Sequence, residues 1–378
     1  MMKVRSFAIL VVMLAVLAGV AYHTSVKKRD AGLPSELVGT ELLKDLRVND
    51  VVEAVFQSAS GTVRAARRDE IWCAPDKYNY PLDFEQVRRF LRKLDDLKIG
   101  QVVRVNEAQK KELELITPEN VGDDGGSGTL LVLNGVDGIT LAELLVGKTH
   151  LRAGDNMAPS PYGMPGEYPD GRYLCIDDTV VLVSDTFADL PARIEDWFDT
   201  SLLSVPADQV MDVTVSGPAR DTVQLSRENE GAPAELADLG RKKTTDESNA
   251  NKLMGAIAYL KFAGIADPSL DNEAMGLAEP VEYVAKTGDG RTYRLLLGAR
   301  TEPEGEYYVR ISATMDPPSA DEGEEAEAGA ESQKLYDDTT ALNERLSKWT
   351  YLIRGYDAES FFVERKSLIA EVSKVEKE

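Results

Sequence analysis

The stretch Asp185-Thr-Phe-Ala-Asp-Leu-Pro-Ala-Arg-Ile-Glu-Asp-Trp197 has a counterpart further along the chain, Asp337-Asp-Thr-Thr-Ala-Leu-Asn-Glu-Arg-Leu-Ser-Lys-Trp349. An Asp, a Leu, a second aliphatic residue and the final Trp recur in both stretches at an offset of 152 residues. An internal repeat of this kind determines the architecture of the whole chain. We therefore interpret the two stretches as the short terminal helices of two tandem copies, each ending at its tryptophan.

A second pair of helical patterns recurs at an offset of 163 residues. Asp83 and Asp246 are the expected N-caps, because Asp readily accepts hydrogen bonds from the first free amides of a helix. Apolar residues then follow at helical spacing, so that each helix is expected to bury one stripe against a sheet. The two stripes are Val87, Phe90, Leu91, Leu94 and Leu97, and Ala250, Leu253, Met254, Ile257 and Leu260.

Runs with alternating or β-branched residues predict strands on both sides of these helices. The fold class predicted from this order is α+β: two tandem copies of a mostly antiparallel sheet, each with one long packed helix and a short terminal helix. The expected strands are 48–56, 62–66, 128–133, 139–146, 171–176 and 180–183 in the first copy, and 207–215, 222–226, 282–286, 293–297, 305–310 and 334–336 in the second.

These matches also give the domain boundaries: a leader (1–29), a linker (30–47), the first repeat (48–205), the second repeat (206–363) and a charged tail (364–378). Residues 316–332 are acidic and of low complexity, so we expect a disordered loop there. Residues 151–170 form a second long loop, rich in Pro, Gly and Met. These two loops are the candidate recognition segments, because long loops on a rigid scaffold commonly carry binding.

The leader contains a run, 6–26, without Asp, Glu, Lys or Arg. About 20 apolar residues in a helix cross the hydrocarbon of a bilayer, so the run predicts a single N-terminal transmembrane helix. The alternative is a secretory signal peptide cleaved after Ala21, with the small residues Gly19 and Ala21 at the cleavage site. The signal-like pattern favours the bulk of the chain on the periplasmic or outer side of the cytoplasmic membrane.

The chain has 43 basic and 65 acidic residues and a net charge of −22. Nucleic acid is therefore excluded as a main partner, because phosphate binding needs a cationic face. Cys73 and Cys175 are the only cysteines. They can pair in an oxidising compartment, or they can be two buried thiols that pack like small apolar residues.

No motif predicts chemistry. The only histidines are His23 and His150, so a serine triad or a zinc site lacks its residues. Neither a dinucleotide-binding nor a P-loop glycine pattern is present. In a chain this acidic, paired carboxylates are expected on solvated faces, and none has the spacing of an EF-hand loop. We therefore assign no catalytic, cofactor-binding or metal residue. The pairs are Asp95-Asp96, Asp123-Asp124, Asp177-Asp178 and Asp337-Asp338.

The three tryptophans, Trp72, Trp197 and Trp349, are expected in the core rather than as platforms for a ligand. Trp197 and Trp349 each complete an apolar stripe at helical spacing. A large aromatic side chain has most area to bury at such a position.

The order of short motifs resembles the family known as domain of unknown function 4340. The motifs are Val48-Asn-Asp-Val-Val, a strand ending at Trp72, Tyr80-Pro-Leu-Asp83 before a helix with Val87 and Leu91, Leu145-Val-Gly147, Gly171-Arg-Tyr173, and a helix ending at Trp197. The resemblance covers most of 40–365 in two copies, although the second copy lacks the first tryptophan and the Tyr-Pro lead-in. It implies a bacterial envelope protein associated with ABC transporter subunits of the gliding-motility type, and it supplies no catalytic residues.

The expected function is therefore non-enzymatic: a membrane-anchored envelope protein that is an accessory, scaffold or binding subunit of an ABC-type transport system. Two alternatives remain. One is a secreted hydrolase that uses paired carboxylates. The other is a module that binds cell-wall polymer, carbohydrate or lipid.

Overall fold

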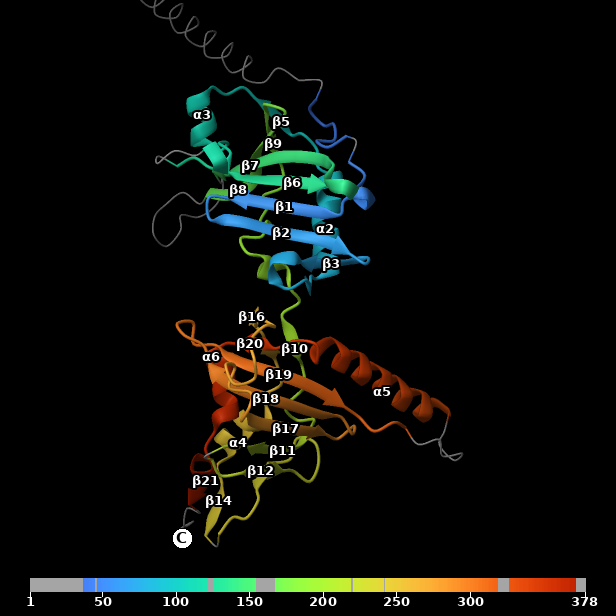
Figure 1. The fold of residues 1–378 in the computed structure, drawn as a ribbon, viewed down its shortest axis with the longest axis vertical. Coiled ribbons are helices and arrows are strands. Elements are labelled where there is room, and N and C mark those ends of the chain that lie inside the picture. The colour runs from blue at the N-terminus through green and yellow to red at the C-terminus, as the bar shows by residue number, and fades with distance from the viewer. Residues whose placement is uncertain are drawn as a thin grey trace, which may run out of the picture. The chain divides into compact units, whose positions relative to one another are not determined.

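The computed structural model describes seven stretches of the chain, which separates into two units, Met1–Phe198 and Asp199–Glu378 (Figure 1). The sequence had placed this division after Val205. Both units are α+β with mostly antiparallel sheets, which confirms the predicted fold class at that level. The described residues are 37–44, 46–120, 125–153, 167–218, 220–240, 242–318 and 326–371.

The predicted transmembrane helix, 6–26, lies outside the described residues, and so does most of the charged tail. None of the helices in the described part of the chain has the length and apolar character that a bilayer span requires.

Unit 1 contains one nine-stranded antiparallel sheet with the order β4-β3-β2-β1-β6-β7-β8-β9-β5. Its strands are β1 (Glu53–Ser58), β2 (Gly61–Arg68), β3 (Ile71–Ala74), β4 (Tyr80–Pro81), β5 (Gln101–Val103), β6 (Thr129–Asn134), β7 (Thr140–Ala153), β8 (Glu167–Ile176) and β9 (Thr179–Val183). Its helices are α2 (Phe84–Asp95) and α3 (Glu107–Glu112), with the short 3-10 helices η1 (Val48–Asp50), η2 (Pro75–Lys77), η3 (Pro118–Asn120), η4 (Val136–Gly138) and η5 (Ile194–Trp197).

Helix α2 forms where the sequence predicted it. The Asp83 carboxylate accepts hydrogen bonds from the amides of Glu85 (2.9 Å) and Gln86 (3.2 Å), which caps the helix. The predicted apolar stripe is buried against one face of the sheet. At its centre the Phe90 ring lies 5.5 Å from that of Phe56 on β1 and 5.1 Å from that of Trp197, so these aromatics form the middle of the core.

Unit 2 contains an eight-stranded sheet with the order β13-β12-β11-β17-β18-β19-β20-β16, and the two-stranded pairs β10–β15 and β14–β21. Its strands are β10 (Ser201–Leu203), β11 (Val210–Ser216), β12 (Val223–Ser226), β13 (Glu235–Leu236), β14 (Lys243–Thr245), β15 (Leu260–Lys261), β16 (Gly264–Ile265), β17 (Val281–Thr287), β18 (Thr292–Arg300), β19 (Tyr307–Thr314), β20 (Tyr351–Ile353) and β21 (Ile369–Glu371). Its helices are α4 (Glu247–Met254), α5 (Ala326–Leu346), α6 (Gly355–Ala358), η6 (Glu359–Phe362) and η7 (Arg365–Leu368).

The second predicted long helix is shorter than expected. Asp246 caps it as predicted, accepting from the amide of Asn249 at 2.9 Å. Helix α4 ends at Met254, however, because Gly255 follows as its C-cap. Ile257 and Leu260 are still buried, but they lie beyond the helix.

The expected disordered loop 316–332 is contradicted for 326–332, and the expected strand 334–336 is wrong. Residues 316–318 are irregular, as expected for a loop, and 319–325 lie outside the described residues. Residues 326–332 and 334–336 belong to the long helix α5. Ala, Glu, Gln, Lys and Leu dominate this stretch, and all of them favour helix. Thr339 and Leu346 are buried, and the Asn343 side chain accepts from the Ala313 amide on β19 at 3.1 Å, so packing on the sheet supports the helix.

The two predicted terminal helices are confirmed only in part. In the second stretch 337–346 is helical, but as the end of the long helix α5 and not as a short helix ending at Trp349. Between Asp185 and Trp197 only the last four residues are helical, as η5, because Pro191 interrupts the stretch and Phe187 has a left-handed φ of 53°. Trp349 lies between α5 and β20, whereas Trp197 follows β9. The offset of 152 therefore does not connect residues at the same place in the two sheets.

Candidate functional site

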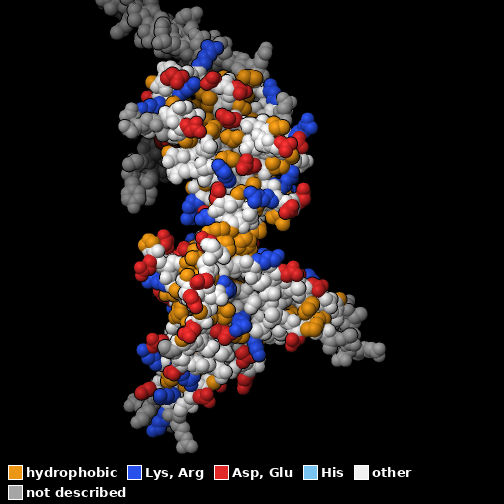
Figure 2. Space-filling model, viewed as in Figure 1, with side chains coloured by type: hydrophobic (Ala, Val, Ile, Leu, Met, Phe, Trp, Pro, Cys, Tyr) orange, Lys and Arg blue, Asp and Glu red, His pale blue; other side chains and the backbone are white. Residues whose placement is uncertain are grey.

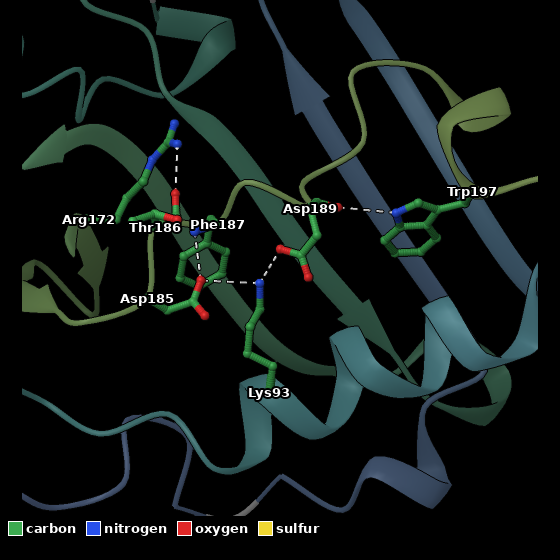
Figure 3. Close-up of polar contacts among 7 residues, drawn as sticks. All are labelled: Lys93, Arg172, Asp185, Thr186, Phe187, Asp189 and Trp197. Atoms are coloured by element: carbon green, nitrogen blue, oxygen red, sulfur yellow. Dashed lines mark hydrogen bonds and ion pairs between the residues drawn. The ribbon is translucent and has the colours of Figure 1, made fainter. Parts of the chain in front are cut away.

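A cluster of charged and aromatic side chains in unit 1 surrounds Lys93, near the end of α2 (Figure 3). Lys93 lies one turn after the buried Phe90, so its side chain leaves the helix along the edge of the apolar stripe. Its Nζ is 3.3 Å from Oδ1 of Asp185, and it also pairs with Asp189. The same ammonium is 4.9 Å from the ring centre of Phe90 and 4.4 Å from that of Phe187. Its side chain is only 18% exposed, so these contacts are partly shielded from water.

The two aspartates belong to the irregular segment that follows β9. The Phe187 amide donates to Asp185 Oδ1 at 2.6 Å, which holds the tight turn that buries the Phe187 ring. Trp197 donates from its indole nitrogen to the carbonyl of Asp189 at 3.2 Å. Asp185 and Asp189 thus connect the segment to α2 through their carboxylates, while the backbone of Asp189 connects it to the core tryptophan.

Arg172 on β8 holds the same segment from the sheet side. Its Nε donates to the carbonyl of Gly147 at 2.6 Å, and its Nη1 donates to that of Thr186 at 3.1 Å. Burial lowers the pKa of this guanidinium, and the nearby carboxylate of Glu114 opposes that shift. The Lys93 cluster therefore acts as a cross-link between α2, β8 and the segment after β9, and its charged groups are engaged within the protein.

A second polar group joins β7 and β8. His150 Nδ1 lies 2.5 Å from Asp170 Oδ1, and Arg152 lies 3.9 Å from the other oxygen of the same carboxylate. The ring of Tyr173 is 5.7 Å from that of His150, and burial raises the pKa of its hydroxyl. When Nδ1 carries the proton, the carboxylate fixes the tautomer that a general base requires. Sequence reasoning missed this pair, because a lone histidine gives no signal before the strands are paired.

The acid pairs are not brought together. Asp95 and Asp96 end α2, Asp177 and Asp178 form the turn between β8 and β9, and Asp337 and Asp338 lie on α5. Asp123 and Asp124 lie outside the described residues. Across the described ranges, no group of three or more His, Cys, Asp or Glu side chains is placed to hold a metal ion.

The cysteines and tryptophans lie as follows. Both cysteines are free thiols: Cys73 on β3 is buried and Cys175 on β8 is partly buried. Trp72 and Trp197 are buried, which confirms the core prediction for these two, while Trp349 is partly buried.

The candidate recognition loops are only partly described. β7 extends to Ala153 and β8 begins at Glu167, so both ends of the predicted loop 151–170 are strand, and 154–166 lies outside the described residues. On the face shown in Figure 2, acidic and basic side chains are interspersed over each unit. Among the described residues, three hollows have volumes of about 310, 550 and 350 Å³, and each is lined by both polar and apolar residues.

The described residues therefore form an α+β protein built on antiparallel sheets, with polar clusters that cross-link its elements. Residues 169–280 match the model of a family described as Domain of unknown function (DUF4340). The match begins in β8 and ends just before β17, and it supports the family resemblance over that stretch. Comparison with curated proteins and with solved structures gave no match.

Proposed function

We propose that this chain is a membrane-anchored envelope protein without catalytic activity, which serves as a scaffold or binding subunit for an ABC-type transport system. The observation that carries the proposal is the order of parts: a charge-free run, 6–26, precedes two sheet units. A run of that length is sufficient to cross a bilayer, with the two units outside the cytoplasm. The charged groups of the Lys93 cluster pair with one another inside the protein and join its elements. This arrangement fits a binding scaffold better than an enzyme.

We further propose that the two units are tandem copies of one module. The strand order supports this: β2-β1-β6-β7-β8-β9-β5 in unit 1 corresponds in connectivity to β12-β11-β17-β18-β19-β20-β16 in unit 2. The last strand in each order, β5 or β16, comes from the segment that follows the Asp-capped helix, α2 or α4.

Matching hydrogen bonds support the same proposal. The amide of the cap Asp83 donates to Trp197 O at 2.9 Å, and that of the cap Asp246 donates to Leu368 O at 2.9 Å. The residue three positions after each cap adds a second bond through its side-chain amide. Gln86 donates to the carbonyl of Asp196 at 3.1 Å, and Asn249 donates to that of Ser367 at 2.9 Å. Asp196 and Ser367 directly precede the acceptors Trp197 and Leu368. On this alignment η7 corresponds to η5, and the counterpart of Trp197 is Leu368.

An arginine at the end of the second strand gives another match: Arg67 is the last residue but one of β2, and Arg227 directly follows β12. Arg67 donates to the carbonyl of Asn49 at 3.2 Å, and Arg227 donates to that of Asp208 at 3.4 Å. In each unit the acceptor lies just before the first strand of the sheet, so both arginines tie the first hairpin to its lead-in.

Purification of the full chain from native membranes tests the function. We expect the protein to stay in the membrane pellet after washing with high salt or alkali, and chemical crosslinking to recover subunits of an ABC-type transporter. A matched variant, Leu17→Arg, places a charge in the middle of the apolar run and is expected to lower membrane retention.

Two results would contradict the proposal. A mature protein that begins at Tyr22 and remains in the soluble envelope fraction would favour the secreted alternatives. Repeated crosslinking that recovers no transporter subunit from a membrane-retained protein would remove the transport assignment while leaving the anchor in place.

A further inference from the structure

The turn between β6 and β7 exposes apolar side chains. Val136 and Ile139 are each 64% exposed and Leu141 is 38% exposed; we call these three residues the apolar tip. The turn itself is well formed, because the Gly135 amide donates to Ile139 O at 2.8 Å and the Ile139 amide donates to Val136 O at 3.4 Å. Large apolar side chains that are exposed together in one place are typical of an interaction surface.

The turn between β17 and β18 of unit 2 provides a contrast. It is polar: Arg291 pairs with Asp289 at 2.5 Å, and the Thr287 hydroxyl donates to the same carboxylate at 2.5 Å. The Gly288 amide donates to the carbonyl of Gln209 at 3.1 Å. A hairpin in this setting therefore does not need exposed apolar residues, and the apolar tip is particular to unit 1.

The apolar tip lies beside the segment through which the chain enters unit 1. The Val52 amide donates to Asn134 O at 2.8 Å, next to the turn. A hollow of about 350 Å³ is lined on one side by Leu42, Leu43 and Leu46 and on the other by Leu141. Two further exposed apolar residues, Leu37 and Val38, begin the described part of this segment.

The length of chain before this segment limits how far unit 1 can lie from a bilayer. The charge-free run ends at residue 26, and ten residues, 27–36, separate it from Leu37. Ten residues span at most about 35 Å when fully extended. Three of them, Lys27, Lys28 and Arg29, are basic and are attracted to anionic headgroups, which favours a shorter distance.

We propose that the apolar tip inserts into the headgroup region of the same membrane that anchors 6–26, so that unit 1 has a second contact with lipid. This inference rests on the proposed anchoring. Apolar side chains at the boundary between headgroups and acyl chains bind by burying their area there, as interfacial anchors do.

The test uses the full chain reconstituted into vesicles of phosphatidylethanolamine and phosphatidylglycerol, with or without brominated acyl chains that quench tryptophan. Val136→Trp and Ile139→Trp each place a probe on the apolar tip. Lys286→Trp places the control probe at an exposed position on β17, in the other hairpin. The emission of the parent protein is subtracted, and an unchanged unfolding transition shows that each variant folds.

We expect the two tip probes to lose emission in brominated vesicles and the control probe to keep it. Flotation of the same vesicles shows whether the chain is bound to the membrane at all, and so separates the proposed anchor from the proposed insertion of the apolar tip. A chain that fails to float overturns the anchor and the inference together. A chain that floats with unquenched tip probes overturns the inference alone. Unquenched but blue-shifted tip emission assigns the apolar tip to a protein surface, and equal quenching of the control shows that the contact is unspecific; either result overturns the inference.

Discussion

Lys93 connects two parts of unit 1, helix α2 and the segment after β9, through one ammonium group. Its partners Asp185 and Asp189 lie on the segment after β9, and the rings beneath it belong to α2 and to that same segment. Removal of the cation leaves two carboxylates close together in a partly buried setting, where water screens their repulsion poorly.

We therefore expect Lys93→Met to lower the free energy of unfolding of unit 1 by about 1–3 kcal/mol, between the values for exposed and fully buried pairs. The matched control is Arg88→Met on the same helix, which breaks the Arg88–Glu85 pair at an exposed site, with side chains 47% and 60% exposed. Its expected loss is below about 0.5 kcal/mol. Chemical denaturation measures both, and equal losses for the two variants would contradict the cross-link.

Local signals at single residues could be predicted from the sequence, but distant contacts could not. Asp83 and Asp246 were correctly predicted as caps, because a cap depends on residues only two or three positions away. Lys93 and its aspartates are more than 90 positions apart, so no periodicity connects them before the sheet is assembled. For the same reason the contact of His150 with Asp170 was not predicted.

At the scale of elements, Gly147 on β7 and Gly298 on β18 allow a close backbone approach in each unit. A Cβ at Gly147 would lie 2.4 Å from Leu113 O, and one at Gly298 would lie 2.1 Å from Met275 O. The next residue donates to the same carbonyl in both cases, Lys148 to Leu113 and Ala299 to Met275, each at 2.8 Å. The segments that contain Leu113 and Met275 can therefore pack against these strands only because the glycines have no side chain.

We expect Gly147→Ala and Gly298→Ala each to cost roughly 1–3 kcal/mol of stability, because the added methyl group has to displace backbone. Gly240→Ala is the control, since no atom lies within 4 Å of the Cβ position there. It should be neutral or slightly stabilising. Thermal unfolding compares the three variants, and an unchanged midpoint for Gly147→Ala would show that the connecting segment can move away.

Helix α5 shows how composition can mislead at this scale. A low-complexity acidic stretch predicts disorder when its residues have nothing to pack against. The same Ala, Glu and Lys residues favour helix, and Asn343 and Leu346 attach the end of the helix to unit 2. Whether such a stretch folds is decided by tertiary contacts, which are not visible in the local sequence.

At the scale of the whole molecule, the alignment of the two units determines which residues are equivalent. In the proposed tandem arrangement the hydrogen bonds of the caps make Leu368 the counterpart of Trp197, whereas the sequence pattern makes Trp349 its counterpart. The recurring Asp, Leu and Trp gave a clear pattern, but the second stretch lies mostly in α5, which is inserted between β19 and β20. The order of strands within a sheet could be inferred from successive hairpins in the sequence. The position of the inserted helix α5 could not be inferred from the sequence.

We expect Leu368→Ala to cost about 2–5 kcal/mol, because this fully buried side chain packs in η7 beside α4. Hydrogen exchange should also become faster at the amide of Asp246, which donates to Leu368 O. Trp349→Ala is the comparison: it should leave exchange at Asp246 unchanged and act near α5 and β20 instead. Faster exchange at Asp246 in the Trp349 variant would contradict this alignment.

The position of α5, between the neighbouring strands β19 and β20, has an evolutionary consequence. In unit 1 the strands β8 and β9 are joined by a turn of two residues, Asp177 and Asp178, whereas in unit 2 the link between β19 and β20 contains all of α5. The strand that follows this link is paired on both sides in each unit: β9 pairs with β8 and β5, and β20 pairs with β19 and β16. Its register therefore does not depend on the length of the link. This junction can therefore accept an insertion while the sheet stays intact. If the two units are copies of one module, as we propose, an insertion here lets them acquire different roles.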